Sequence, residues 1–254
     1  MVKGIETFRK FFKDYDTNYI IIGGTACDIL FDDIGIEYRA TKDIDMILIV
    51  EALSEDFVAK FWEFVKLGNY AHKQKSTGDK KFYRFMKPVN ENYPFQLELF
   101  SRKADFLDEN YKGTLTPIPT GDDLSSLSAI LMNDNYYSFT IDNSEVKEEL
   151  HIASAETLIC LKAKAYLDLK QRKEDGSQVD SNQFKKHKLD VLRLTQLLTS
   201  ERIEVVSEVI KNDLYLFLDD IANDENIDRN LNSLKIRTSK EEIIEQIRKY
   251  FKLS

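Results

Sequence analysis

Short apolar runs in the first half of the chain alternate with segments whose apolar residues recur at helical spacing. The apolar run at 19–22 ends at a pair of glycines, and a second run occupies 43–50. Runs of this length, bounded by glycine or polar residues, are typical of buried strands, so we expect a strand in each. Helical spacing predicts helices over 4–16, about 25–32 and about 54–67, the last between a Ser54 N-cap and a Gly68-Asn69 C-cap.

Two further extended runs, 80–86 and 94–100, flank a turn-rich segment and predict a hairpin. Prolines and a glycine indicate irregular chain over 111–120. Beyond it we expect a helix over 122–132 and short strands over 136–141 and 150–152.

The second half of the chain has helical periodicity throughout. We therefore expect an α+β protein, in which a mixed sheet flanked by helices (residues 1–150) precedes a C-terminal helical bundle (residues 151–254). Helices are expected over 155–172 after Ser154, 182–199 after Ser181, 201–222, and 239–252, where Ser239 and Glu242 have the spacing of a capping box.

Length, charge and the distribution of apolar residues argue against several classes of protein. A chain of 254 residues can bury a sizeable core, and its net charge of −8 argues against broad, nonspecific nucleic-acid binding. The charged N-terminus lacks the apolar core of a signal peptide, and the sequence has no apolar run of 18 residues. Cys27 and Cys160 lie in apolar surroundings and resemble buried small hydrophobic residues. We expect a cytoplasmic protein without a membrane partner.

The candidate chemistry begins with two acids at the start of the second strand. Successive strand residues point to opposite faces, so Asp43 and Asp45 share one face and Ile44 lies on the other. Two neighbouring carboxylates repel each other unless a cation lies between them, and Mg²⁺ prefers such oxygen ligands. Acid pairs also cap turns or lie on exposed edges, but here an apolar strand follows directly, which favours a metal-binding pair.

The glycine pair supplies a complementary feature. Gly23 and Gly24 follow an apolar strand and precede a helix, so backbone N–H groups and a helix N-terminus could approach a phosphate there. A simple tight turn is the alternative. Thr25 could donate its hydroxyl to the phosphate, cap the helix, or do both.

Other polar residues extend the candidate site. Glu98 is a lone acid in an apolar strand, so we expect either a third metal carboxylate or a structural acid paired with Arg84. Arg39 and Lys42 flank the acid pair, where they could neutralise it, contact phosphate, or remain plain surface charges.

A local excess of positive charge marks the helical half. Residues 162–193 hold nine Lys or Arg against five acids. Lys162 lies at the edge of an apolar stripe, and Lys186 and Asp190 share a line on the next helix. This segment could meet a triphosphate or an RNA backbone, or form a solvated helix pair with Lys–Asp contacts. For His187 a core or surface role is favoured over a catalytic one.

Taken together, these motifs resemble those of the AbiEii/AbiGii nucleotidyltransferases, bacterial toxins of type IV toxin–antitoxin and phage-defence systems. The resemblance covers roughly residues 15–200. It is carried by Gly-Gly-Thr-Ala at 23–26, Arg-Ala-Thr-Lys-Asp-Ile-Asp at 39–45, FQLELFSR at 95–102, LICLKAKAYLDLKQRKEDG at 158–176 and KKHKLDVLRL at 185–194.

The resemblance implies a polymerase-β-like nucleotidyltransferase fold, Mg²⁺ (or Mn²⁺) as cofactor and an NTP as co-substrate. Asp43 and Asp45 match the metal-binding pair, and Gly23, Gly24 and Thr25 match the phosphate turn. Lys162 and the segment from Lys186 to Asp190 match a later basic and acidic motif. Glu98 is a less secure third acid, because family members vary there. The gap between Gly24 and Asp43 is longer than in the minimal aminoglycoside-transferase pattern, and nothing matches after about residue 200.

The expected reaction moves an NMP from the NTP onto an acceptor hydroxyl. Metal ions held by Asp43, Asp45 and Glu98 would bridge the phosphates and the attacking hydroxyl, and Glu98 would help to deprotonate it. Lys162 and Lys186 would stabilise the leaving pyrophosphate. The acceptor would be tRNA, another RNA end or a protein, and a toxin would have a cognate antitoxin. The alternatives are a catalytically inactive nucleotide- or RNA-binding module of the same fold and a transferase acting on antibiotics or metabolites.

Overall fold

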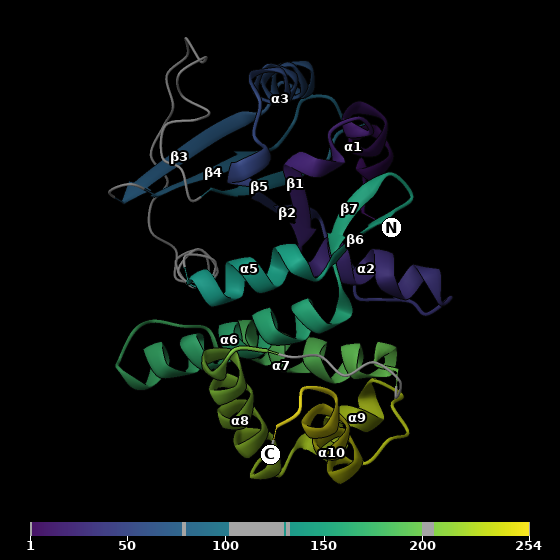
Figure 1. Ribbon diagram of the computed structural model, residues 1–254, viewed down its shortest axis with the longest axis vertical. Helices are drawn as coiled ribbons and strands as arrows, with labels where there is room; N and C mark the ends of the chain where they lie inside the picture. Colours follow the sequence, from purple (N-terminus) through teal and green to yellow (C-terminus); the bar gives the residue numbers. More distant parts are fainter. Residues whose placement is uncertain (1, 78–79, 102–129, 131–132, 200–205, 254) are drawn as a thin grey trace. The chain divides into compact units, whose positions relative to one another are not determined.

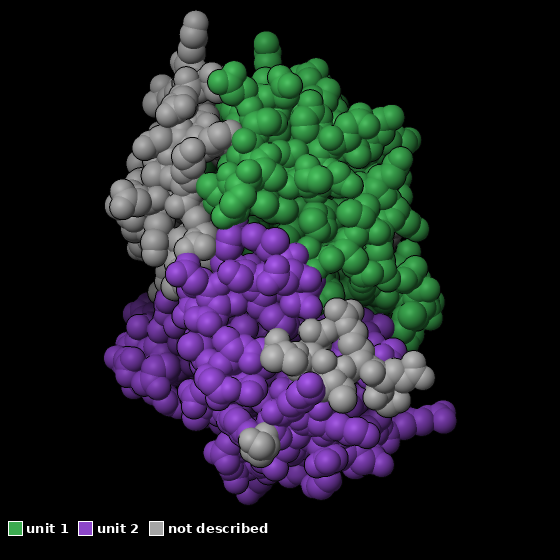
Figure 2. All heavy atoms as spheres, in the orientation of Figure 1, with its two compact units in different colours: residues 1–120, 144–154 green, residues 121–143, 155–254 purple. Residues whose placement is uncertain are grey.

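The computed structural model describes residues 2–77, 80–101, 130, 133–199 and 206–253. The chain divides into two compact units (Figure 2): residues 1–120 with 144–154, and residues 121–143 with 155–254. The sequence places a single boundary after residue 150, whereas the chain passes between the two units three times, because residues 121–143 group with the second unit and residues 144–154 with the first.

The first unit is built on a mixed sheet (Figure 1). Among the described residues this sheet has seven strands in the order β3-β4-β5-β2-β1-β7-β6. Strand β2 pairs antiparallel with β1 and parallel with β5, and β1 pairs parallel with β7. The strands are β1 Tyr19–Ile22, β2 Asp43–Leu48, β3 Ala71–Thr77, β4 Lys80–Met86, β5 Gln96–Ser101, β6 Ser144–Lys147 and β7 Leu150–Ala153. The strands expected over 19–22, 43–50, 80–86, 94–100 and 150–152 are confirmed, as is the hairpin of β4 with β5; β3 and β6 were not predicted.

One face of this sheet carries an aromatic core. Tyr19 and Phe85 lie on this face, and rings from two helices pack against them. Phe8 and Phe12 come from α1 (Ile5–Phe12), and Phe61 comes from α3 (Glu55–Gly68). These five side chains are at most 1% exposed, so they exclude water from this side of the sheet. The core therefore fixes which strand residues point away from it.

The ends of α3 follow the expected capping chemistry. The Ser54 side chain accepts a hydrogen bond from the Phe57 N–H, and Asn69 ends the helix in the left-handed conformation. The remaining helical elements among the described residues of this unit are α2 (Gly23–Asp33) and two 3₁₀ turns, Asp16–Asn18 and Val50–Ala52.

The second unit is helical. Its described helices are α5 Asp134–Asp142, α6 Ala155–Glu174, α7 Ser181–Leu194, α8 Glu208–Ala222, α9 Ile227–Ser233 and α10 Lys240–Tyr250, with a 3₁₀ turn at Thr195–Leu197. The expected strand over 136–141 is wrong: this segment is α5, where an Asn133 cap begins a helix and tertiary burial of Tyr136 outweighs its strand propensity. Helix α9 was not predicted.

Polar pairs join the helices of this unit. Lys162 on α6 binds Asp190 on α7, while Lys164 and Lys170 on α6 bind acids on α8, Asp213 and Asp220. The apolar stripe of α6 is buried as expected. Helix α7 is capped by Asp180 and ends at Leu194, whereas the sequence suggested a Ser181 cap and an end at 199. The capping box at Ser239 is present.

Some expectations fall outside the described residues. These are the irregular chain over 111–120, the helix over 122–132 apart from Ile130, and residues 201–205 of the helix predicted over 201–222, which in the described residues begins only at Glu208, after a Ser207 cap. In the described part of the chain, no helix combines the length and apolar character needed to cross a membrane. Cys27 and Cys160 are buried and form no disulfide.

Candidate active site

Three predicted acids lie on the sheet face opposite the aromatic core. Asp43 and Asp45 alternate with the buried Ile44 along β2. In the parallel pairing of β2 with β5, Asp45 lies directly opposite Glu98. Side chains that oppose each other across a sheet share a face. The carboxyl groups of Asp43, Asp45 and Glu98 therefore form one row on two neighbouring strands, here called the acid row.

The glycine turn lies against this row. Ile22, the last residue of β1, pairs with Asp45, and helix α2 begins at the next residue, Gly23. Gly23 has φ of +68°, and a Cβ atom built on it would lie 2.1 Å from Asp45 Oδ2. Any side chain at this position would therefore displace the Asp45 carboxylate, in addition to the strain of the left-handed backbone.

The start of α2 is tied to β2 by further contacts. The buried Thr25 hydroxyl donates a hydrogen bond of 2.6 Å to the Asp43 carbonyl oxygen, which fixes the helix N-terminus beside the acid pair. This contact gives Thr25 a structural role. A Cβ atom on Gly24 would lie 2.8 Å from Thr41 Oγ1 and 3.7 Å from Arg39 Nη2. The segment before β2 therefore packs against the glycine turn and brings Arg39 to it.

The two flanking cations differ in their surroundings. Arg39 is half-buried, and its guanidinium lies 5.3 Å from the centre of the Tyr38 ring. Lys42 is exposed. Stacking restrains Arg39 near the turn, whereas Lys42 has the environment of a surface charge.

Glu98 is held by its neighbours on the sheet. Arg84, its partner across β4 and β5, places Nε and Nη2 each 2.7 Å from Glu98 Oε1. The Gln96 amide donates a further hydrogen bond of 2.6 Å to the same oxygen. This is the paired arrangement that the sequence offered as the alternative to a metal ligand.

Burial still governs the protonation of Glu98. The residue as a whole is 7% exposed, and burial raises the pKa of its side chain above the ordinary value of 4.5. The Arg84 guanidinium lowers this pKa, the Asp43 charge raises it, and a hydrogen bond with the Asp45 side chain lowers it. Asp43, Asp45 and Glu98 are thus close enough to influence one another.

The donor set fits a hard divalent cation through Asp43 and Asp45. Their oxygens share a face, and Mg²⁺ commonly takes one or two carboxylates together with waters and substrate phosphates. In the described residues, no group of three or more His, Cys, Asp or Glu side chains is arranged as a metal site. A metal site with three carboxylate ligands would require the Glu98 side chain to rotate away from Arg84.

The remaining predicted residues belong to the second unit. Lys162 Nζ lies 2.8 Å from Asp190 Oδ2, with the two side chains 6% and 0% exposed. Arg193 Nη1 lies 3.5 Å from the other oxygen of Asp190. Lys186 is exposed. The ammonium of Lys162 is thus neutralised by Asp190, the other member of the predicted motif.

Two neighbours of the acid row were not predicted to belong to the site. Gln96 is two residues before Glu98 on the same face and opposite Asp43, and strand alternation could have pointed to it. Thr41 packs on Gly24 from an irregular segment, and no periodicity indicates that contact.

Comparisons with known proteins find a likeness among solved structures. No family model matches the chain, and no curated protein matches it. Among solved structures, the chain is similar to an antigenic nucleotidyltransferase-like protein from Paracoccidioides brasiliensis, with 13% sequence identity and a TM-score of 0.44, over 91% of this chain and 92% of that chain. We therefore infer the function from the residues and contacts of the site.

Proposed function

We propose that the chain is a metal-dependent nucleotidyltransferase that moves an NMP from an NTP onto an acceptor hydroxyl. The observation that carries this proposal is the contact between the glycine turn and the acid pair, in which a Cβ on Gly23 would meet Asp45 Oδ2 at 2.1 Å. A phosphate-accepting turn beside two carboxylates is the combination that nucleotidyl transfer requires.

Each part of the site has a separate task in this proposal. The backbone of Gly23 and Gly24 and the N-terminus of α2 receive nucleotide phosphates, since no Cβ atom blocks the approach. Asp43 and Asp45 hold Mg²⁺ or Mn²⁺, which supplies charge neutralisation at the phosphates when bound. Arg39 contributes positive charge at the same turn.

Glu98 has the environment of a proton acceptor. A catalytic base works best when its pKa approaches the working pH, and burial raises the pKa of Glu98. Arg84 and Gln96 orient the carboxyl group through Oε1. We assign Glu98 to the removal of the proton from the attacking hydroxyl.

Lys162 requires a change from the expected role. It is buried and paired with Asp190, so we propose that it orders α6 against α7. Lys186, which is exposed, stays a proposed contact for the nucleotide phosphates. The acceptor is an RNA end such as that of tRNA, or a protein hydroxyl. We further propose a toxin role with a cognate antitoxin, on the resemblance of the motifs.

Labelling tests this proposal. Purified protein is incubated with each α-labelled NTP, Mg²⁺, total tRNA and cell extract, and labelled RNA and protein are separated on gels. We expect label on one class of acceptor with the wild-type chain and none with Asp45→Asn. Asp32→Asn, an exposed acid near the end of α2, is the matched control and retains transfer. Full transfer by a folded Asp45→Asn protein would exclude the mechanism.

One observation favours a second candidate, a non-catalytic nucleotide-binding module. Arg84 and Gln96 both donate hydrogen bonds to Glu98 Oε1, and the Arg84 charge neutralises the third acid. Such a module would bind an NTP in calorimetry and label no acceptor under any of the conditions above. Labelling by the wild-type chain decides against it.

A further inference from the structure

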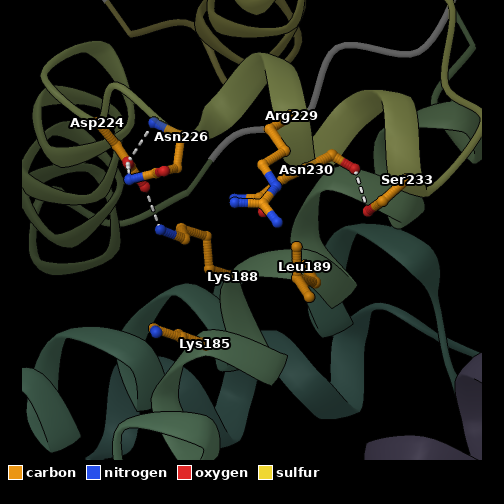
Figure 3. A pocket seen from close by; sticks show the side chains of 8 residues that line it. All are labelled: Lys185, Lys188, Leu189, Asp224, Asn226, Arg229, Asn230 and Ser233. Atoms are coloured by element: carbon orange, nitrogen blue, oxygen red, sulfur yellow. Dashed lines mark hydrogen bonds and ion pairs between the residues drawn. The ribbon is translucent and has the colours of Figure 1, made fainter.

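A second candidate binding site lies within the helical unit and involves none of the residues of the acid row. It is a pocket of 570 Å³ between α7 and the α8–α9 region, lined by Lys185, Lys188, Leu189, Asp224, Asn226, Arg229, Asn230 and Ser233 (Figure 3). Pockets of about 300–1,000 Å³ are the usual size for small-molecule ligands. This volume is large enough for a ligand of nucleotide size.

The lining combines positive charge with hydrogen-bonding groups. It has three cations, Lys185, Lys188 and Arg229, against a single acid, Asp224. Lys185 and Arg229 are exposed, and Figure 3 shows the Arg229 side chain reaching from α9 toward α7. The net charge of the lining is positive in a chain whose net charge is −8, so the pocket selects anions.

One cation is fixed in place before any ligand arrives. Lys188 is 8% exposed and forms an ion pair with Asp224. Asp224 also accepts a hydrogen bond of 2.8 Å from the Asn226 N–H, which ties the start of α9 to α7. An ammonium has three donors, and the Asp224 contact uses one of them. The pair therefore fixes the Lys188 ammonium and the start of α9 in the lining of the pocket.

The amide side chains extend the chemistry beyond charge. Asn226 and Asn230 each offer donors and acceptors, and Leu189 supplies an apolar surface. A phosphate group alone would use the cations and leave these groups unused. A ligand with a phosphate, a sugar hydroxyl and a flat base would use all three kinds of contact.

We propose that this pocket binds a nucleoside phosphate, either as a free nucleotide or as one residue of an RNA strand, through Lys185, Lys188 and Arg229. The phosphate lies between the cations of α7 and α9, and the amides contact the sugar or base. This proposal is independent of the transferase mechanism, because the pocket shares no residue with the acid row.

Binding measurements in EDTA test the pocket without metal-dependent chemistry. The probes are AMP in calorimetry and a fluorescein-labelled eight-nucleotide RNA in anisotropy, each with the wild-type chain and with the double variant Lys185→Ala/Arg229→Ala. Both substituted side chains are exposed, so the fold is expected to survive. We expect the double variant to weaken binding about tenfold or more, since each substitution removes a charged hydrogen bond to the phosphate. For RNA, we also expect the affinity of the double variant to depend less steeply on salt concentration than that of the wild-type chain.

A matched control and the two probes separate the outcomes. Lys249→Ala removes an exposed cation of α10 outside the pocket lining and leaves binding unchanged. Weakened binding of AMP identifies a free nucleotide as a ligand, and a loss confined to RNA identifies the RNA strand. If the double variant binds both probes as the wild-type chain does, or if the wild-type chain binds neither, the proposal is wrong.

Discussion

Arg84 and Glu98 face each other across β4 and β5, with two guanidinium nitrogens each 2.7 Å from one carboxylate oxygen. Glu98 is nearly buried and Arg84 is partly exposed, with side-chain exposures of 9% and 22%. The pair therefore sets both the charge and the orientation of the acid opposite Asp45.

Removal of Arg84 should destabilise the first unit. In Arg84→Met, Glu98 keeps its burial and loses two charged hydrogen bonds, so we expect a loss of about 1–3 kcal/mol in the free energy of unfolding by urea. The control is Lys3→Met, which breaks a salt bridge whose side chains are 64% and 88% exposed and should cost less than about 0.5 kcal/mol. Equal effects of the two substitutions would contradict the prediction.

Glu98 should make stability depend on pH. Its pKa is raised in the folded chain, so the folded state binds the proton more strongly than the unfolded state does. The stability gained in this way is complete below the unfolded pKa, near 4.5, and is lost as the pH rises through the folded pKa. Glu98→Gln does not titrate and should become more stable relative to the wild-type chain from pH 4 to pH 8. Urea titrations across this range measure the difference, and a constant or falling difference would refute it.

Gly23 should be less replaceable than another glycine with the same backbone conformation. Gly23 and Gly35 have φ of +68° and +70°, but a Cβ on Gly35 would meet nothing within 4 Å. Each substitution by alanine costs about 1–2 kcal/mol from the backbone. Gly23→Ala should lose at least about 1 kcal/mol more in unfolding experiments, because its Cβ displaces Asp45. Adding Asp45→Ala should remove much of that excess, and an unchanged excess would argue against the clash.

The buried pair of Lys162 and Asp190 should respond differently to single and double substitution. Lys162→Met leaves a buried carboxylate with its main partner removed, which costs about 3–5 kcal/mol. The double variant Lys162→Met/Asp190→Leu should recover most of this loss. Lys211→Met, which removes a surface pair with Glu208, is the control. If Lys162→Met retains full stability and loses nucleotide affinity, Lys162 is a ligand contact after all.

Tyr136 should link α5 to α8. Its hydroxyl donates a hydrogen bond of 2.9 Å to Asp213 Oδ2, and Lys164 Nζ lies 2.7 Å from the other oxygen of that carboxylate. Tyr136→Phe removes a hydrogen bond to a charged group and should cost about 1.5–3 kcal/mol, measured by urea unfolding. A change below about 0.5 kcal/mol would show that packing of the ring alone holds α5.

Much of the local structure could be predicted from the strand and helix patterns of the sequence. Apolar runs placed β1, β2, β4 and β5, because a strand with a buried face needs apolar residues at alternate positions or throughout. Alternation along β2 was enough to put Asp43 and Asp45 on one face. The pattern failed at α5, where Tyr and Phe suggested a strand and burial against other helices selected a helix. It also missed β3, whose polar sequence resembles a loop.

A glycine turn that precedes two carboxylates on one strand face could be predicted from the amino-acid sequence, since both features depend on neighbouring residues. The position of Glu98 opposite Asp45, its neutralisation by Arg84 and the burial of Lys162 against Asp190 follow only from the folded structure. Strand register and helix packing depend on residues far apart in the chain, and a lone acid or lysine has several partners of similar energy until the surrounding core excludes all but one.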